Sequence, residues 1–304
     1  MPKLTVLMPA YNAERTIDRA IASTLVALPR GGAVLVYDDA STDRTPEILE
    51  GWARRDLRVR WHRASDNGGV GVALDWLVHH ASSPWIARMD ADDVCLPWRF
   101  QPAWMIAKSL GVDFCFTGAL NVDDCLRPIR PTVPWPLGAA AVKYDLVVDN
   151  SLFHGAVLAR REALFELGGY RDVEAEDYDL WMRAVLEGCT IVRVPWQGYL
   201  YRSHQDQVTQ SEHHHAALRE SEWLAQSHAH LTEVATGRRF EIFPALQTDR
   251  NQLSAQQRGE IAALADVLEA SLAADPAVRW WDRVFLKTRR IARLRSMAEG
   301  AAHA

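Results

Sequence analysis

Short apolar runs alternate with amphipathic segments up to residue 93, and this alternation restricts the chain to a small set of folds. The apolar runs cover residues 4–8, 33–37, 57–62 and 85–89, and the amphipathic segments between them cover 15–28, 45–55 and 70–80. Strands separated by a helix usually pair in parallel, with the crossover helices on the faces of the sheet. We therefore predict an α/β fold with a mostly parallel sheet flanked by helices.

The composition is that of a globular protein and argues against several classes. With 304 residues, of which 48% are hydrophobic, the chain is long enough for one large α/β domain with an appendage. A net charge of -5 argues against a general nucleic-acid binder. The four cysteines show no Cys-x-x-Cys spacing, no apolar leader precedes residue 4, and no apolar run approaches the roughly 18 residues of a membrane span. We predict a cytoplasmic protein whose only membrane contact would be peripheral.

Polar clusters follow three of the predicted strands. They are Tyr11-Asn12, Asp38-Asp39 and Asp90-Ala91-Asp92-Asp93. Ligands of parallel sheets bind at the carboxyl ends of the strands, so these clusters predict a site. The Gly-x-Gly-x-x-Gly and Gly-x-x-x-x-Gly-Lys-Ser/Thr phosphate loops are both missing. A divalent cation that bridges a diphosphate to an Asp-x-Asp pair is the alternative way to hold phosphate.

A second acidic motif, Glu176-Asp177-Tyr178-Asp179-Leu180-Trp181, lies beside another apolar segment. Carboxylates crowded next to buried residues require a cation or a reaction to justify them. On a helix, Asp177 shares a face with Leu180 and Trp181, whereas Glu176 and Asp179 lie near Arg183. We therefore predict that Asp177 is the carboxylate that points inward, with Glu176 as the runner-up.

Seven motifs, in this order, resemble the inverting, GT-A-fold glycosyltransferases of family two. The resemblance extends over roughly residues 3–209 and implies a Rossmann-like catalytic domain at 1–209, with a nucleotide-binding half at 1–93 and an acceptor half at 94–209. The motifs are Pro9-Ala10-Tyr11-Asn12, Tyr37-Asp38-Asp39-Ala40-Ser41-Thr42-Asp43, Asn67-x-Gly69, Arg88-Met89-Asp90-Ala91-Asp92-Asp93, Gly168-Gly169-Tyr170, the 176–181 motif and Tyr201-Arg202-Ser203-His204.

The resemblance implies a role for each of these residues. Asp39 would accept the uracil N–H of a UDP-sugar, and Asp92 would hold Mn2+ or Mg2+ against the diphosphate. Asp177 would take the acceptor proton as the general base, with Glu176 as the runner-up. The implied nucleotide-sugar-binding residues are Pro9, Tyr11, Asn12, Asp38, Asp39, Asn67, Asp90 and Asp92; His204 is a second metal or diphosphate contact, and His154 and Trp181 lie on the acceptor side. The segment after Gly69 departs from the family, because Val72-Ala73-Leu74-Asp75 lacks the usual basic residue and asparagine.

These roles predict a metal-dependent inverting glycosyltransferase that moves a sugar from UDP to a hydroxyl of a glycan or lipid-linked acceptor, in bacterial polysaccharide or glycolipid assembly. The alternative is a sugar-nucleotide-binding partner protein without catalysis. A haloacid-dehalogenase-like phosphatase would carry Asp-x-Asp after the first strand, and a nucleotidyltransferase would carry a glycine-rich loop there. Each motif also has a purely structural interpretation. Asp38-Asp39 could form a turn and helix cap, residues 90–93 a solvated loop, and Asp177 the carboxylate at a helix start. His204 could be a structural histidine, and most of the tryptophans could belong to the core.

After residue 209 the composition becomes helix-favouring, and we predict a helical extension at 210–304 with helices at 213–236 and 254–273. The last predicted helix, 280–297, combines apolar residues with a basic face. Such a face could lie on the inner, anionic surface of the cytoplasmic membrane. The alternative is that it packs on the catalytic domain or on a second subunit, which leaves a homo-oligomer open.

Overall fold

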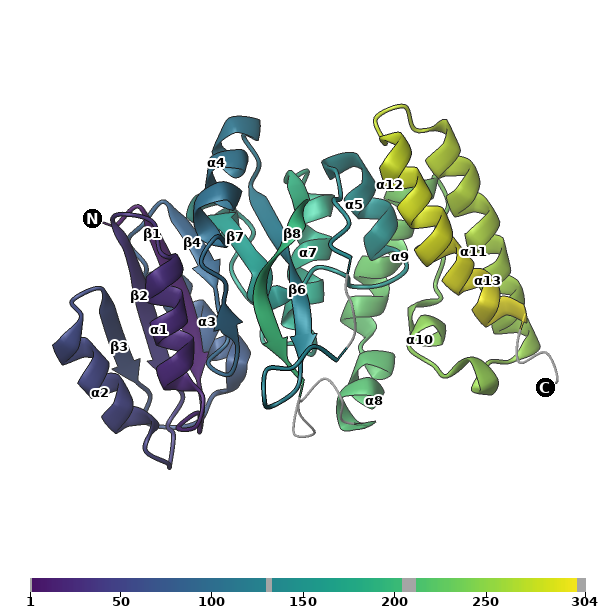
Figure 1. Ribbon diagram of the computed structural model, residues 1–304. Helices are drawn as coiled ribbons and strands as arrows, with labels where there is room; N and C mark the ends of the chain where they lie inside the picture. The colour runs from purple at the N-terminus through teal and green to yellow at the C-terminus, as the bar shows by residue number, and fades with distance from the viewer. Residues whose placement is uncertain (1, 130–132, 204–211, 300–304) are drawn as a thin grey trace. The chain divides into compact units, whose positions relative to one another are not determined.

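The computed structural model describes residues 2–129, 133–203 and 212–299, and the chain forms two compact units (Figure 1). Unit 1 comprises Met1–Trp135, Leu152–Glu176 and Cys189–His204, and unit 2 comprises Pro136–Ser151, Asp177–Gly188 and Gln205–Ala304. This differs from the predicted division at residue 209, because two segments of the predicted catalytic domain group with the C-terminal helices.

Unit 1 contains an eight-stranded sheet in the order β3-β2-β1-β4-β7-β6-β8-β5. The first four strands pair in parallel, as do β6 and β8, whereas β7 is antiparallel to both β4 and β6, and β5 is antiparallel to β8. The predicted α/β fold with a mostly parallel sheet is confirmed. The strands are β1 (Leu4–Ala10), β2 (Gly32–Asp38), β3 (Val59–Arg63), β4 (Trp85–Arg88), β5 (Val94–Cys95), β6 (Phe114–Val122), β7 (Val157–Arg160) and β8 (Ile191–Arg202).

The first three helices of unit 1 follow the first three strands, as the alternating pattern predicts. The helices of unit 1 are α1 (Ile17–Ala27), α2 (Thr45–Arg55), α3 (Gly69–His80), α4 (Phe100–Leu110), η1 (His154–Ala156) and α6 (Arg161–Glu166). The predicted strand 57–62 starts two residues too early, since Leu57 is 90% exposed and precedes β3. A core that includes Val6, Val34 and Ala87 of three adjacent strands and Ile21 of α1 holds the carboxyl ends of β1, β2 and β4 at one edge.

Unit 2 is built from helices. They are α5 (Ala139–Leu146), most of α7 (Glu176–Leu186), α8 (Glu212–Glu220), α9 (Glu222–Thr236), α10 (Phe243–Leu246), η3 (Arg250–Gln252), α11 (Ala255–Ala274), α12 (Trp280–Phe285), the π-helical turn η4 (Leu286–Ile291) and α13 (Ala292–Glu299). The predicted helix 213–236 is two helices, because the Ser221 side chain caps the first turn of α9. Ser254 and Gln257 form a capping box at the start of α11.

Within the described ranges 2–129, 133–203 and 212–299, no helix is both long and apolar enough to cross a membrane.

The buried side chain of His228 makes the stability of unit 2 depend on pH. His228 is fully buried on α9, and its Nε2 lies 2.8 Å from the Val147 carbonyl oxygen. Burial lowers the pKa of His228 from 6.5 to about 4, against the opposing effect of that hydrogen bond. The unfolded chain therefore binds the proton more readily, and stability falls as the pH drops from about 6.5 towards about 4.

We expect about 3 kcal/mol of unfolding free energy to be lost between pH 7 and pH 4 through this one group. Urea titrations of the wild type and of His228→Gln at both pH values measure it. Glutamine offers an amide donor but does not titrate, so the variant should lose less stability over the same range. Equal losses in the two proteins would show that His228 is not the responsible group.

Candidate functional site

Asp39 follows β2 and holds the loop that leads into α3. Its carboxylate accepts hydrogen bonds from the backbone N–H of Gly68 at Oδ1 and of Gly69 at Oδ2, both 2.8 Å long. The Asn67 amide donates to the Asp39 carbonyl at 3.3 Å. Each carboxylate oxygen has two lone pairs, so Asp39 can accept a further N–H from a bound base. The fold thus brings together two of the predicted nucleotide-binding residues.

Asp38 and Asn12 are engaged in the turns at the same edge. The Asp38 side chain is fully buried, accepts from the Ser41 N–H at 3.3 Å and lies 3.3 Å from Nε of Arg63. Asn12 has a φ of 48°; its N–H donates to Oγ of Ser41 and its Oδ1 accepts from the Thr42 N–H, both at 2.9 Å. These contacts agree with the turn interpretation of Asp38 and give Asn12 a role in joining two strand-end loops.

The end of β1 carries the two predicted base-packing residues. Tyr11 is 52% exposed, and Pro9 is half-buried in register with Tyr37 of β2. Burial, followed by the charge of Asp39, raises the pKa of the Tyr37 phenol. An exposed aromatic ring beside the Asp39 strand is suited to packing on a planar base.

Asp90, two residues after β4, forms a two-point ion pair with Arg88. The Arg88 Nη1 and Nη2 atoms lie 2.7 and 2.6 Å from the two carboxylate oxygens. Burial raises the pKa of Asp90; the Arg88 charge opposes this change and the Asp92 charge adds to it. The pair fixes the Asp90 carboxylate in one orientation.

Asp93 and Asp92 are held by Arg202, at the end of β8. The buried Asp93 accepts from the Arg202 N–H at 2.7 Å through Oδ1, while its Oδ2 has no hydrogen-bond partner among the described residues. Burial and the charges of Asp90 and Asp92 raise the pKa of Asp93 well above its usual range. Arg202 Nε donates to the Asp92 carbonyl at 2.8 Å. Asp92 itself is only half-buried, so its carboxylate is the more accessible of the two.

His154, at the start of η1, joins Glu176 and Tyr170. Its Nε2 lies 2.8 Å from the Tyr170 hydroxyl, and its Nδ1 lies 3.4 Å from a Glu176 carboxylate oxygen. Burial alone would lower the pKa of Arg88, but the charges of Asp90 and Glu176 raise it above its ordinary value. His154 and Glu176 therefore belong to one charged network with Asp90, which the sequence spacing did not reveal.

Arg99, just before α4, lies among these residues of the candidate site but belongs to none of the predicted motifs. It is fully buried and donates to the carbonyls of Arg88 and Gly155. Its guanidinium carbon lies 5.1 Å from the Tyr199 ring centroid. A Cβ on Gly155 would come within 2.9 Å of the Asp90 carboxylate, so the backbone approaches closely here. Nothing in the local sequence pattern marks Arg99, because its partners lie on distant segments.

The 176–181 motif continues into unit 2, where two of its acids have different surroundings. Asp177 is half-buried and accepts at Oδ2 from the Asn150 amide, 2.9 Å away. Asp179 is fully buried, pairs with Nε and Nη2 of Arg183 at 2.8 and 2.7 Å, and accepts from the Trp223 indole at 2.7 Å. The expected proximity of Asp179 to Arg183 is confirmed. Asp179, rather than Asp177, is the more deeply buried acid. Both carboxylate oxygens of Asp179 accept hydrogen bonds from side chains of unit 2.

Two further predicted residues have different outcomes. Trp181 is fully buried on α7 in unit 2, a position typical of a core residue. His204 lies outside the described residues.

The acidic edge of unit 1 fits a cation that is held partly by substrate. Among the described residues no three His, Cys, Asp or Glu side chains lie together as a ready metal cluster. Mg2+ in phosphate-binding sites usually takes only one or two carboxylates and fills its shell with phosphate oxygens and water. Asp92, half-exposed after β4, supplies a carboxylate of that kind, whereas the Asp93 carboxylate is buried.

Comparison with known proteins gives a family model and several relatives. The model "Glycosyl transferase family 2" matches residues 5–168. The putative glycosyltransferase EpsE of Bacillus subtilis (strain 168) is 32% identical over 197 residues, which cover 62% of this chain and 68% of EpsE.

Solved structures resemble the whole chain at low sequence identity. TarS 1-349 of S. aureus, in complex with UDP-GlcNAc, matches with a TM-score of 0.66 and 17% identity over 98% of this chain and 90% of TarS 1-349. The mannosyltransferase PcManGT from Pyrobaculum calidifontis, in complex with GDP-Man and Mn2+, has a TM-score of 0.56 and 19% identity, covering 98% and 84% of the two chains. These similarities show that the fold is of the GT-A kind.

Proposed function

This chain belongs to glycosyl transferase family 2, and on that premise we propose that it transfers a sugar from a UDP-sugar to an acceptor hydroxyl with inversion at the anomeric carbon. The observation that carries the proposal is the placement of Asp39 and Asp92 after β2 and β4, the two neighbours of β1, at one edge of the sheet. Only β1 therefore separates Asp39, which would accept a hydrogen bond from the nucleotide base, from Asp92, which would lie beside the diphosphate.

The nucleotide would be recognised by complementarity of hydrogen bonds. A carboxylate accepts but does not donate, so Asp39 favours a base with an imide N–H, such as uracil. Guanine also presents N–H donors, and PcManGT was solved with GDP-Man, so a GDP-sugar is the rival donor. TarS, with the higher TM-score of 0.66, was solved with UDP-GlcNAc, and this favours uridine.

The chain's residues would divide the work of transfer. Asp90, fixed by Arg88, would orient the ribose or the sugar, and Asp177 would remove the proton from the attacking hydroxyl. Asp92 would hold Mn2+ or Mg2+, which when bound neutralises negative charge on the diphosphate leaving group. The acceptor, a glycan or a lipid-linked sugar, and contact of 280–297 with a membrane surface remain predictions.

A panel of nucleotide sugars tests the function. UDP-, GDP- and dTDP-sugars are incubated with the full chain and Mn2+, Mg2+ or chelator, and binding and slow hydrolysis of the donor are measured. We expect metal-dependent turnover of one UDP-sugar. Turnover of a GDP-sugar alone would overturn the uridine assignment, and binding without any turnover would favour the alternative of a non-catalytic sugar-nucleotide-binding partner.

Replacing Asp39 by asparagine should weaken donor binding more than it slows catalysis. The amide would direct one donor group towards the N–H of Gly68 or Gly69, which now donate to Asp39, and it would lose a charged acceptor for the base. Hydrogen bonds to charged groups contribute about 1.5–3 kcal/mol, so the Kd for UDP should rise roughly tenfold to hundredfold. Calorimetric titration with UDP measures this. Asp66→Asn serves as the control, because Asp66 is exposed in the loop that carries Gly68. Equal affinity in the two variants would contradict the base contact.

A further inference from the structure

The Asp177 carboxylate receives hydrogen bonds from within unit 2 at both of its oxygens. The Asn150 amide donates to Oδ2 at 2.9 Å, and the Tyr178 N–H donates to Oδ1 at 2.7 Å. A carboxylate held in this way keeps one rotamer, and a proton acceptor must lie at hydrogen-bond distance from the group it deprotonates. The position of Asn150 therefore determines the direction in which Asp177 presents its oxygens.

Asn150 belongs to a short segment, residues 145–151, that is fastened to several helices. The Tyr178 hydroxyl of α7 donates to the Leu146 carbonyl, and Nε2 of His228 on α9 lies 2.8 Å from the Val147 carbonyl oxygen. Both side chains are buried, and each ring contacts that of Phe243, with centroids 5.9 and 5.2 Å apart. The backbone that carries Asn150 is thus fixed on the side of α7 and α9.

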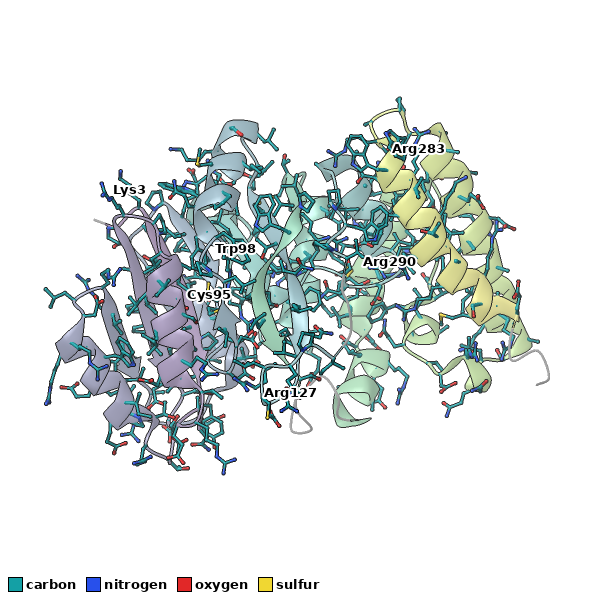
Figure 2. The ribbon with its side chains drawn as sticks, viewed as in Figure 1. Lys3, Cys95, Trp98, Arg127, Arg283 and Arg290 are labelled. Carbon is teal, nitrogen blue, oxygen red and sulfur yellow. The ribbon has the colours of Figure 1, made fainter. Side chains whose placement is uncertain are left out.

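The same segment is tied to the C-terminal helices by charge. Asp145 is fully buried, and its Oδ1 accepts from Nε of Arg290 at 2.5 Å. Asp149 lies 3.2 Å from Nη1 of Arg290 and 2.5 Å from Nη1 of Arg293. Arg290 comes from the π-helical turn η4, as can be followed in Figure 2, where it is labelled. These ion pairs flank Asn150 on the N-terminal side and join residues about 140 positions apart in sequence.

Several basic residues of the predicted helix 280–297 form ion pairs within unit 2. Lys287 and Arg295 both pair with Glu269 of α11, and Arg293 pairs with Asp149. Arg289, by contrast, is exposed. Ion pairs within unit 2 therefore engage several of these charges, and Arg289 offers a matched control on the same turn as Arg290.

We infer that Asn150 is a positioning residue for Asp177, and that Arg290 acts on the same carboxylate through Asp145 and Asp149. The C-terminal helices then help to orient the Asp177 carboxylate within unit 2. This inference rests on the proposed function, since it requires Asp177 to act as the general base. It extends that function to a part of the chain, beyond residue 209, which the sequence motifs do not reach.

A double-mutant cycle tests the inference. With the UDP-sugar that the wild type hydrolyses, kcat and KM are measured for Asn150→Ala, Asp177→Asn and the double variant. Asn150→Ala should lower kcat about tenfold or more and leave KM within about twofold. Because Asn150 acts through Asp177, adding Asn150→Ala to Asp177→Asn should lower kcat no further. A merely structural role would lower kcat by the same factor in both backgrounds.

The Arg290 arm uses Arg290→Lys, Arg290→Met and Arg289→Met. Lysine retains the charge, so kcat should fall less in Arg290→Lys than in Arg290→Met, while Arg289→Met should match the wild type. UDP affinity should stay unchanged in all three. If Arg290→Met fails to fold, the Asn150 cycle still tests the positioning role of Asn150, and kcat of Arg290→Lys still tests the contribution of Arg290.

The outcomes separate the two claims. A wild type that hydrolyses no nucleotide sugar overturns the proposed function and the inference with it. An active wild type with full kcat in Asn150→Ala, or with additive losses in the cycle, overturns the positioning role alone.

Discussion

Replacing Asp92 by asparagine is expected to reduce metal-dependent donor turnover by about a thousandfold, the scale that several kcal/mol of lost charge stabilisation implies. An amide is a poorer ligand than a carboxylate for a hard divalent cation. Arg202 donates its hydrogen bond to the backbone carbonyl of Asp92, so the side-chain substitution does not remove this bond. The loss should therefore come from the ligand and not from the fold.

The neighbouring acids show why Asp92 is singled out. Both oxygens of Asp90 are paired with Arg88, and Asp93 is buried with one oxygen bonded to the Arg202 N–H. Asp93→Asn is the matched control, because an amide oxygen can still accept from Arg202, and its effect should stay within about tenfold.

The measurements are donor turnover and UDP binding, each titrated with Mn2+. Asp92→Asn should lose the metal-dependent part of the affinity, whereas Asp93→Asn should keep most of it. If Asp92→Asn binds UDP with an unchanged Mn2+ dependence, another residue holds the cation, and His204 becomes the next candidate to test.

The sequence predicted those parts of the candidate site that depend on local pattern. Alternating apolar runs located the first four strands, and polar residues directly after them located Asp39 and Asp92 at one edge, because parallel strands share their carboxyl ends. Two predicted boundaries differ from the structure. Leu57 looked like the start of a strand yet is exposed, and Ser221 interrupts what looked like one helix by capping α9.

Contacts between distant segments could not be predicted from local pattern. The antiparallel strand β7 lies between β4 and β6, so His154 reaches the Asp90 network from a segment that follows the first acidic motif by some sixty residues. Arg99 and Arg290 likewise bind groups far away in sequence, and neither lies in a recognisable motif. Helical periodicity placed Asp177 inward, but it could not show that Arg183 and Trp223 would bury Asp179 instead.

Replacing Asp177 by asparagine is expected to reduce transfer by a factor of about a hundred to ten thousand, the range that loss of a general base produces. The amide is nearly isosteric and can still accept from Asn150, but it does not take up a proton. Donor binding should be nearly unchanged, because the contacts that we propose for the nucleotide and the diphosphate are made by other residues. The loss should therefore appear in kcat, with KM for the donor close to that of the wild type.

Glu176 is the competing candidate for the general base, and its contacts differ from those of Asp177. Its carboxylate lies 3.4 Å from Nδ1 of His154 in unit 1 and acts on Arg88, whereas Asp177 is bonded to Asn150 in unit 2. Glu176→Gln should disturb the Asp90–Arg88 network and raise KM for the donor, with a smaller loss of kcat than Asp177→Asn. The reverse pattern, a hundredfold loss of kcat in Glu176→Gln and little change in Asp177→Asn, would make Glu176 the base and remove the reason for Asn150 to act on catalysis at all.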